Sequence, residues 1–201
     1  MALLAAQLLA ENRLGYFSFG AVSPLNGKLL FDALLIGAWC LSVGFTEEIL
    51  FRGYALVEGS RAFSFWPAVV LLSILFGIPH WLKGGGENFF GGMEAFLFGI
   101  GLAYSFRITG SLWLAIGFHA GWDYAQSFLF GVPDSGLVSA GRLFHPTIHG
   151  PAWLSGGSVG PEGSVLSVAV IVVFVAMVRL ADLRLKAEEK KKAAQQAKPG
   201  A

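Results

Sequence analysis

Ionisable side chains stand inside segments of this sequence that are otherwise apolar, and they are of the types that do acid–base or metal chemistry. Such groups are costly in an apolar span and usually face the interior of a helical bundle or a water-filled cavity. One such side chain alone could be a structural residue whose hydrogen bonds are satisfied, but several together indicate a buried polar site. The candidates are Glu47, Glu48, Arg52, His80, His119 and Asp123.

The first motif is Glu47-Glu48-x-x-x-Arg52. Glu48 and Arg52 are four positions apart, so they share a helix face and can pair. Glu47 is turned about 140° away from Arg52 at 3.6 residues per turn. The spacing therefore predicts a structural Glu48–Arg52 ion pair and leaves Glu47 available for catalysis. The alternative, in which Arg52 pairs with both carboxylates and neither does chemistry, stays open.

Two histidine motifs follow, each with a spacing of four. Phe76 and His80 share a helix face, so the phenyl ring can restrict the imidazole, and Pro79 removes one helical hydrogen bond beside it. His119 and Asp123 also share a face, where the carboxylate can orient or charge-stabilise the imidazole. Each spacing alone is weak evidence for a functional site. The order of the three motifs along the chain is stronger evidence.

The composition places these residues in a membrane protein. Of 201 residues, 55% are hydrophobic and 13% are charged, whereas soluble domains carry about 25% charged residues. The formal net charge of +1 gives no indication of a nucleic-acid partner. The single cysteine, Cys40, excludes a disulfide within one chain and is expected to be a buried, inert thiol.

Five apolar segments are long enough to cross or nearly cross a bilayer, which takes about 20 helical residues. None alternates as a strand would, and backbone in lipid must satisfy its own hydrogen bonds, so helices are expected. The fold class predicted is an all-α, polytopic transmembrane bundle of five to six membrane helices with short connections. Residues 2–14 are expected to form an interfacial or partly inserted helix. The five segments are residues 29–57, 66–82, 89–107, 111–131 and 164–180.

We expect a single intramembrane domain over residues 1–180 and a charged cytoplasmic tail over 181–201. The distribution of Lys and Arg predicts a cytoplasmic C-terminus, and this prediction rests on the tail. The opposite side would carry Lys28, Lys83 and Arg142. The cytoplasmic side would carry Arg61, Arg107, Arg179, Arg184, Lys186, Lys190, Lys191, Lys192 and Lys198.

The ordered motifs Glu-Glu-x-x-x-Arg, Phe-x-x-x-His and His-x-x-x-Asp on successive apolar helices resemble the CPBP family, also called the Abi family. It comprises CAAX-type prenyl endopeptidases and bacteriocin-processing or immunity-related membrane proteins. The stretch 109–113 before the last motif and the Gly-Pro-Glu-Gly-Ser stretch at 160–164 are similar to bacterial members. The resemblance covers most of residues 29–180 and implies a multi-pass protein of the bacterial cell membrane.

The resemblance implies that Glu47 is the catalytic glutamate and that His80 helps it to activate a water. His119 and the residue four positions later would line the site and stabilise the oxyanion, with Glu48, Arg52 and Phe76 as structural support. The family commonly has Asn where this chain has Asp123. A carboxylate cannot donate a hydrogen bond unless it is protonated. Asp123 would therefore orient His119, bind a metal, or act as a protonated acid.

Two chemistries remain open at this stage. In the first, Glu47 and His80 polarise a water and His119 stabilises the oxyanion, without a metal. In the second, Zn²⁺ is held by His80, His119 and a carboxylate, either Glu47 or Asp123, with an open position for water. No HExxH helix is present, which favours the metal-independent chemistry.

The partners expected are a peptide or protein substrate that reaches the site from the membrane, the lipid bilayer, and no nucleic acid. Two other classes of function compete with a peptidase. One is a non-catalytic binding or bacteriocin-immunity protein on the same fold, and the other is a proton-coupled transporter, since intramembrane acids and histidines also build proton paths. No inverted repeat is visible in the sequence, which counts against transport.

Overall fold

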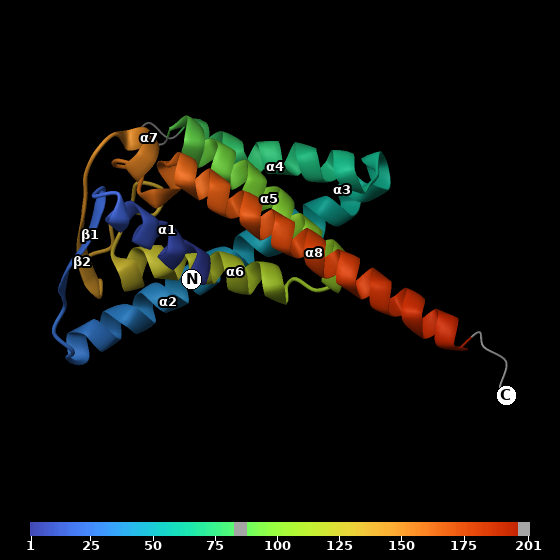
Figure 1. The fold of residues 1–201 in the computed structure, drawn as a ribbon, viewed down its shortest axis with the longest axis horizontal. Helices are drawn as coiled ribbons and strands as arrows, with labels where there is room; N and C mark the ends of the chain where they lie inside the picture. The colour runs from blue at the N-terminus through green and yellow to red at the C-terminus, as the bar shows by residue number, and fades with distance from the viewer. Residues whose placement is uncertain (83–87, 197–201) are drawn as a thin grey trace.

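The computed structural model describes residues 1–82 and 88–196, which are mostly helical. Long helices form a bundle in which α5 packs between α4 and α8, while α2 packs against α6 (Figure 1). The main elements are α1 (Ala2–Arg13), α2 (Gly27–Glu48), α3 (Leu56–Phe63), α4 (Phe65–Leu82), α5 (Phe89–Thr109), α6 (Trp113–Tyr124) and α8 (Val165–Gln196).

Two π-helical segments extend the helices that carry the acidic motifs. The segment η1 (Ile49–Ala55) joins α2 to α3 without a break, and η2 (Ala125–Phe130) continues α6. Their hydrogen bonds run from residue i to i+5, a geometry that is rare and occurs often at functional sites. One π-helical segment begins directly after Glu48 and the other two residues after Asp123.

Three helices among the described residues are long and apolar enough to cross a membrane, and a shorter apolar helix covers Phe65–Trp81. The prediction of a mostly helical membrane bundle is confirmed at this level. The segment predicted at 111–131 is present as α6 and η2, but it is not one of these three helices, so the number of five to six membrane helices stays a prediction. The three candidate spans are Gly27–Phe63, Phe89–Thr109 and Val165–Ala193.

The outer surface of the helices is apolar where a soluble protein would be polar. On α2, Leu34 and Trp39 are exposed, and on α8 Val173 and Met177 are exposed. Large exposed apolar surfaces indicate contact with a membrane or a partner. Together with the candidate spans, they support a membrane location for the chain.

A two-stranded antiparallel sheet joins distant parts of the chain, and the all-α expectation did not include it. β1 (Phe17–Val22) pairs with β2 (Phe144–Ile148), with a bulge at Gly20/Ala21. Gly20 has φ +67°, and a Cβ there would lie only 1.9 Å from the carbonyl oxygen of His145, so the bulge requires glycine. Each strand is only five or six residues long, and β2 contains a proline, which explains why the pattern gave no strand signal.

The short helix α1 is packed into the bundle through one face. Leu4 and Leu8 are fully buried there, beside the buried polar side chains of Gln7 and Glu11. Gln7 donates hydrogen bonds to the carbonyl oxygen of Pro161 at 2.9 Å and to Ser164 at 3.1 Å. The helix expected over residues 2–14 is therefore present at Ala2–Arg13, and its position at the membrane interface stays a prediction.

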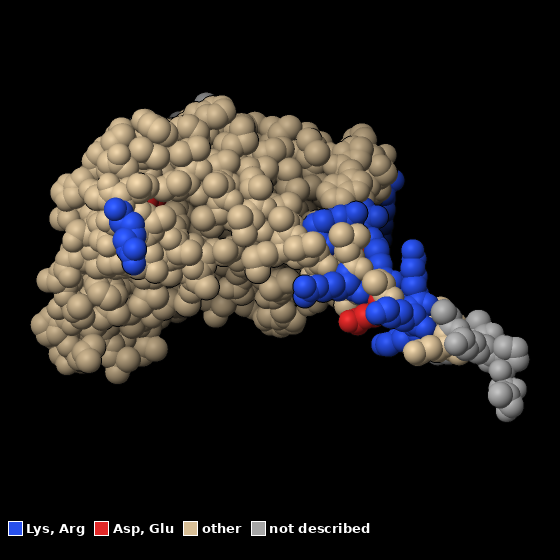
Figure 2. All heavy atoms as spheres, viewed as in Figure 1, with Lys and Arg blue, Asp and Glu red and all other residues tan. Residues whose placement is uncertain are grey.

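Basic side chains gather at one end of the molecule, where α8 extends beyond the bundle (Figure 2). At this end Tyr104 of α5 donates a hydrogen bond to Asp182 of α8 at 2.6 Å, and Arg179 and Lys186 also contact Asp182 at 2.9 and 2.8 Å. The segments whose Lys and Arg residues predict a cytoplasmic side therefore lie at the same end of the fold. Lys83 and Lys198 lie outside the described residues.

Candidate active site

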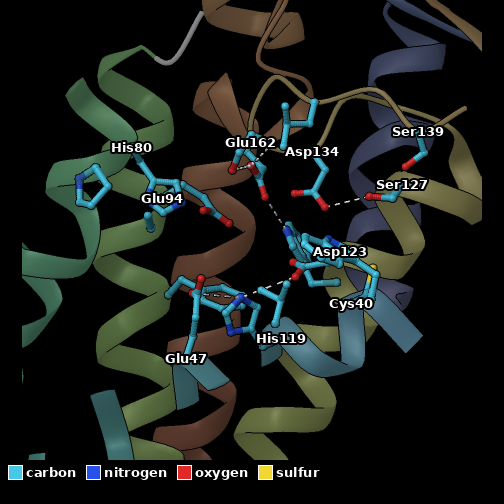
Figure 3. Close-up of a pocket in the computed structure, with 18 of the residues that line it drawn as sticks. Cys40, Glu47, His80, Glu94, His119, Asp123, Ser127, Asp134, Ser139 and Glu162 are labelled. Atoms are coloured by element: carbon cyan, nitrogen blue, oxygen red, sulfur yellow. Dashed lines mark hydrogen bonds and ion pairs between the residues drawn. The ribbon is translucent and has the colours of Figure 1, made fainter. Parts of the chain in front are cut away.

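A cavity of about 860 Å³ opens among α2, α4, α5 and α6, and it contains the side chains that the sequence singled out. Glu47, His80, His119 and Asp123 all line it, as does the buried Cys40 (Figure 3). Most of its remaining wall is apolar, with Trp39, Phe51, Phe76, Phe98 and Trp122 among the lining residues. The cavity is therefore an apolar pocket with a few convergent polar groups, as expected of a binding or catalytic site.

Glu48 and Arg52 form a buried ion pair behind the cavity. Arg52 donates to Glu48 Oε1 at 2.8 Å, and their side chains are 4% and 0% exposed. The same Oε1 accepts a hydrogen bond from Nδ1 of His119 at 2.7 Å. Because a carboxylate accepts here, His119 carries a proton on Nδ1, and Glu48 sets the orientation of the ring.

This contact requires α2 and α6 to approach closely, and small residues allow it. A Cβ added at Gly44 would lie 3.1 Å from the Cβ of Ala120 and 3.2 Å from the carbonyl oxygen of Ile116. Gly44 precedes Glu48 by one helical turn, and Ala120 follows His119. Small residues let helix backbones approach within membranes, and here they bring the two motifs into hydrogen-bond distance.

The other nitrogen of His119 faces two carboxylates. Nε2 lies 3.9 Å from Glu47 Oε2 and 3.7 Å from Asp123 Oδ2, both longer than a hydrogen bond. The side chain of Glu47 is 39% exposed, compared with 13% for Asp123. Glu47 is therefore the more accessible of the two carboxylates that face Nε2, and the acceptor that orients His119 is Glu48 rather than Asp123.

His80 lines the same cavity from α4, across the ring of Phe76. Its Nδ1 is 3.0 Å from the carbonyl oxygen of Phe76, which can only accept, so Nδ1 carries the proton. In the neutral ring Nε2 is then an acceptor.

Phe76 is the common neighbour of these groups. Its ring centroid lies 5.5 Å from that of His80 and 6.1 Å from that of His119, and the guanidinium of Arg52 lies 4.5 Å from it. Phe98 packs edge-on against His119 at 5.3 Å. The imidazole of His119 thus lies between two aromatic rings, that of His80 contacts one, and Arg52 makes a cation–π contact with Phe76.

The zinc alternative requires His80 and His119 to converge with Glu47 or Asp123 on one point. Within residues 1–82 and 88–196, no group of three His, Cys, Asp or Glu side chains is arranged to hold a metal ion. The donor set therefore does not fit a zinc site.

Sequence reasoning missed three further carboxylates that line the cavity, namely Glu94, Asp134 and Glu162 (Figure 3). Glu94 stands inside the predicted span 89–107, so the criterion that found the other six could have found it. Asp134 and Glu162 lie in the connection between the predicted segments 111–131 and 164–180. Only the Gly-Pro-Glu-Gly-Ser stretch signalled Glu162, and no local pattern signals Asp134.

Comparison with known proteins agrees with the motifs. Residues 29–125 match the family model described as type II CAAX prenyl endopeptidase Rce1-like. No curated protein and no solved structure gives a significant match. The matched range contains Glu47, His80, His119 and Asp123, whereas Glu162 lies beyond it.

Proposed function

Because residues 29–125 belong to the family of Rce1-like type II CAAX prenyl endopeptidases, we propose that the chain is a membrane endopeptidase that hydrolyses a peptide bond with a water activated by Glu47. The observation that supports this most is the position of Glu47. Glu47 lines the cavity and is more exposed than Asp123, and it faces an imidazole whose other nitrogen donates to Glu48 of a buried ion pair.

In the first step Glu47 takes a proton from a water in the cavity, and the oxygen of that water attacks the carbonyl carbon of the scissile bond. His80 supports the water, because its Nδ1 is engaged by Phe76 and its Nε2 can accept a hydrogen bond. A positioned general base contributes about 10²–10⁴-fold to such a rate.

The attack leaves a negative charge on the former carbonyl oxygen. His119 would stabilise it through Nε2–H, while Nδ1–H stays with Glu48. Only the doubly protonated ring can donate on both sides. In the second step Glu47 returns its proton to the leaving nitrogen, the C–N bond breaks, and a carboxylic acid and an amine are released.

The experiment that tests this proposal is cleavage of a peptide library by the purified protein and by Glu47→Gln. The variant keeps the size and shape of the side chain but cannot accept the proton, so we expect turnover to fall by about 10²–10⁴-fold with an unchanged unfolding temperature. A matched control is Glu58→Gln, which alters a half-exposed carboxylate paired with Arg61 outside the cavity.

Equal cleavage by wild type and Glu47→Gln would end the catalytic assignment. Loss of activity in a chelator, with recovery on addition of Zn²⁺, would contradict the metal-independent mechanism. A proton-coupled transporter would instead lose proton flux in Glu47→Gln, and a non-catalytic binding protein would lose neither.

The proposal extends to membrane topology. The basic end of the molecule would face the cytoplasm, since Lys and Arg favour that side, and the C-terminal part of α8 would stand in water there. Reaction of a cysteine introduced at Glu188 with a membrane-impermeant maleimide tests this in intact cells and in inverted vesicles.

A further inference from the structure

Glu162 accepts four hydrogen bonds at the cavity. Oε1 accepts from Trp122 Nε1 at 3.2 Å and from Gln126 Nε2 at 2.7 Å. Oε2 accepts from the backbone N–H of Ser135 at 3.0 Å and from its hydroxyl at 3.1 Å. The residue is 7% exposed, and no Lys or Arg among the described residues forms an ion pair with it. Four neutral donors therefore compensate its charge.

These donors come from two different parts of the chain. Trp122 and Gln126 belong to the helix that carries His119 and Asp123. Ser135 belongs to the segment 132–139, from which Asp134, Leu137, Val138 and Ser139 also line the cavity. Glu162 thus bridges the helix of the reactive residues and the outer wall of the cavity, and Figure 3 shows it between them.

The backbone around Glu162 is itself fixed by neighbouring segments. Gln7 of α1 donates to the carbonyl oxygen of Pro161 at 2.9 Å, and Asn88 donates to that of Gly163 at 2.8 Å. Gly160 has φ +97°, and a Cβ there would lie 2.1 Å from the carbonyl oxygen of Pro133. The carboxylate is therefore presented from a rigid turn that touches the segment it holds.

The segment 132–139 has few other attachments of this kind. Gly136 N–H donates to the carbonyl oxygen of Val159 at 2.9 Å, and Ser127 donates to Asp134 at 2.9 Å. Leu137 and Val138 are 71% and 57% exposed, so apolar burial does not hold them. Val132 is fully buried and its N–H donates to the carbonyl oxygen of Gln126 at 3.0 Å, which fixes the start of the segment. The hydrogen bonds from Ser135 to a buried charge anchor the part of the wall beyond it, and bonds to charged acceptors are stronger than neutral ones.

We propose that Glu162 is a positioning residue that docks the segment 132–139 against α6 and thereby forms the wall that the peptide substrate contacts. The catalytic part of this statement rests on the proposed function, but the docking does not. Glu162 does not touch the reacting atoms in this scheme. It determines what fraction of molecules has a complete cavity, and apparent affinity falls in proportion to that fraction.

Glu162→Gln is the test variant, because the amide keeps the volume but turns an NH₂ toward donors. We expect the KM for a quenched fluorescent peptide, built on the best-cleaved library sequence, to rise about tenfold while kcat changes by less than about threefold. Ser135→Ala removes one of the four donors and should give a smaller rise in KM. Glu58→Gln is the matched carboxylate control and should change neither constant.

A second readout needs no catalysis. A nitroxide on a cysteine at Ala140, in a Cys40→Ala background, reports the motion of the segment by electron paramagnetic resonance. We expect faster motion in Glu162→Gln, with no change for a label at Ser42 on α2.

Unchanged motion at Ala140 together with unchanged KM would overturn the proposal, as would a fall in kcat at constant KM. If Glu162→Gln does not fold, Ser135→Ala decides by the same two criteria. If the wild type cleaves no peptide, the proposed function fails, while the label at Ala140 still tests the docking.

Discussion

The two ends of the cavity are built in different ways. At the inner end, Glu47, Glu48 and His119 project from long helices that pack at Gly44 and Ala120. At the outer end, Asp134 and Glu162 sit on short segments between irregular turns, and hydrogen bonds to backbone and small side chains hold them. Helices with fixed spacing make the inner end rigid, whereas the outer end depends on a few polar contacts between distant parts of the chain.

The largest effect at the inner end is expected from Arg52→Leu. This change leaves Glu48 buried without its cation, and breaking such a pair costs about 3–5 kcal/mol of the free energy of unfolding. It should also release His119 and abolish turnover. Thermal unfolding in detergent, read by circular dichroism, measures the first effect.

The control for Arg52→Leu is Arg61→Leu, which breaks the exposed pair with Glu58. An exposed pair contributes about 0–1 kcal/mol, so the unfolding temperature should barely move. Equal losses of stability in the two variants would show that burial does not distinguish the two ion pairs, and the Glu48–Arg52 pair would then not be what stabilises the inner end.

A smaller effect, dependent on pH, is expected at Glu11 on α1, the helix whose Gln7 contacts the turn that carries Glu162. Burial raises the pKa of Glu11 to about 7, although a hydrogen bond from Gln7 opposes this. Between pH 4.5 and about 7 the unfolded chain has lost this proton and the folded chain keeps it, so stability decreases as pH rises through that window. The decrease amounts to about 3 kcal/mol at 1.36 kcal/mol per pKa unit.

Glu11→Gln should remove this dependence and make the protein more stable than wild type at pH 8. Unfolding temperatures of both proteins across pH 5–8 provide the measurement. Parallel profiles for wild type and variant would show that Glu11 does not titrate in this window.

The smallest effect is expected from Asp123→Asn. Glu48, rather than Asp123, makes the hydrogen bond to His119, since Asp123 lies 3.7 Å from Nε2. The amide also offers a donor to the oxyanion, so kcat/KM should change by less than about tenfold, or about 1.4 kcal/mol. Glu48→Gln provides the comparison and should lose more activity than Asp123→Asn. The reverse order would make Asp123 the residue that orients His119.

Part of the inner end could be predicted from the sequence, because its contacts join residues within one helix. A spacing of four within one helix gives the Glu48–Arg52 pair, and the same rule places Phe76 beside His80. What the spacing could not give is the pairing between helices, so the hydrogen bond from His119 to Glu48 was missed. It depends on how α2 and α6 pack, which the sequence expresses only through small residues such as Gly44.

The outer end could not be predicted because its contacts join residues far apart in the chain. Ser135 reaches Glu162, and β1 pairs with β2 across more than a hundred residues. Neither has the periodicity that identifies a helix, and the strands are too short and too irregular to show alternation. The helical class was predicted, whereas the segments that close the cavity were not.

The pairing of β1 with β2 also has a consequence for biosynthesis. Strand Phe17–Val22 leaves the ribosome early, but its partner Phe144–Ile148 is made more than a hundred residues later, roughly 6–25 s at ordinary elongation rates. During that delay the helices bearing Glu47 and His119 can already insert and associate. These two helices can therefore pack together before the sheet forms, and a nascent chain truncated ahead of residue 144 would still lack Glu162, which lines the cavity.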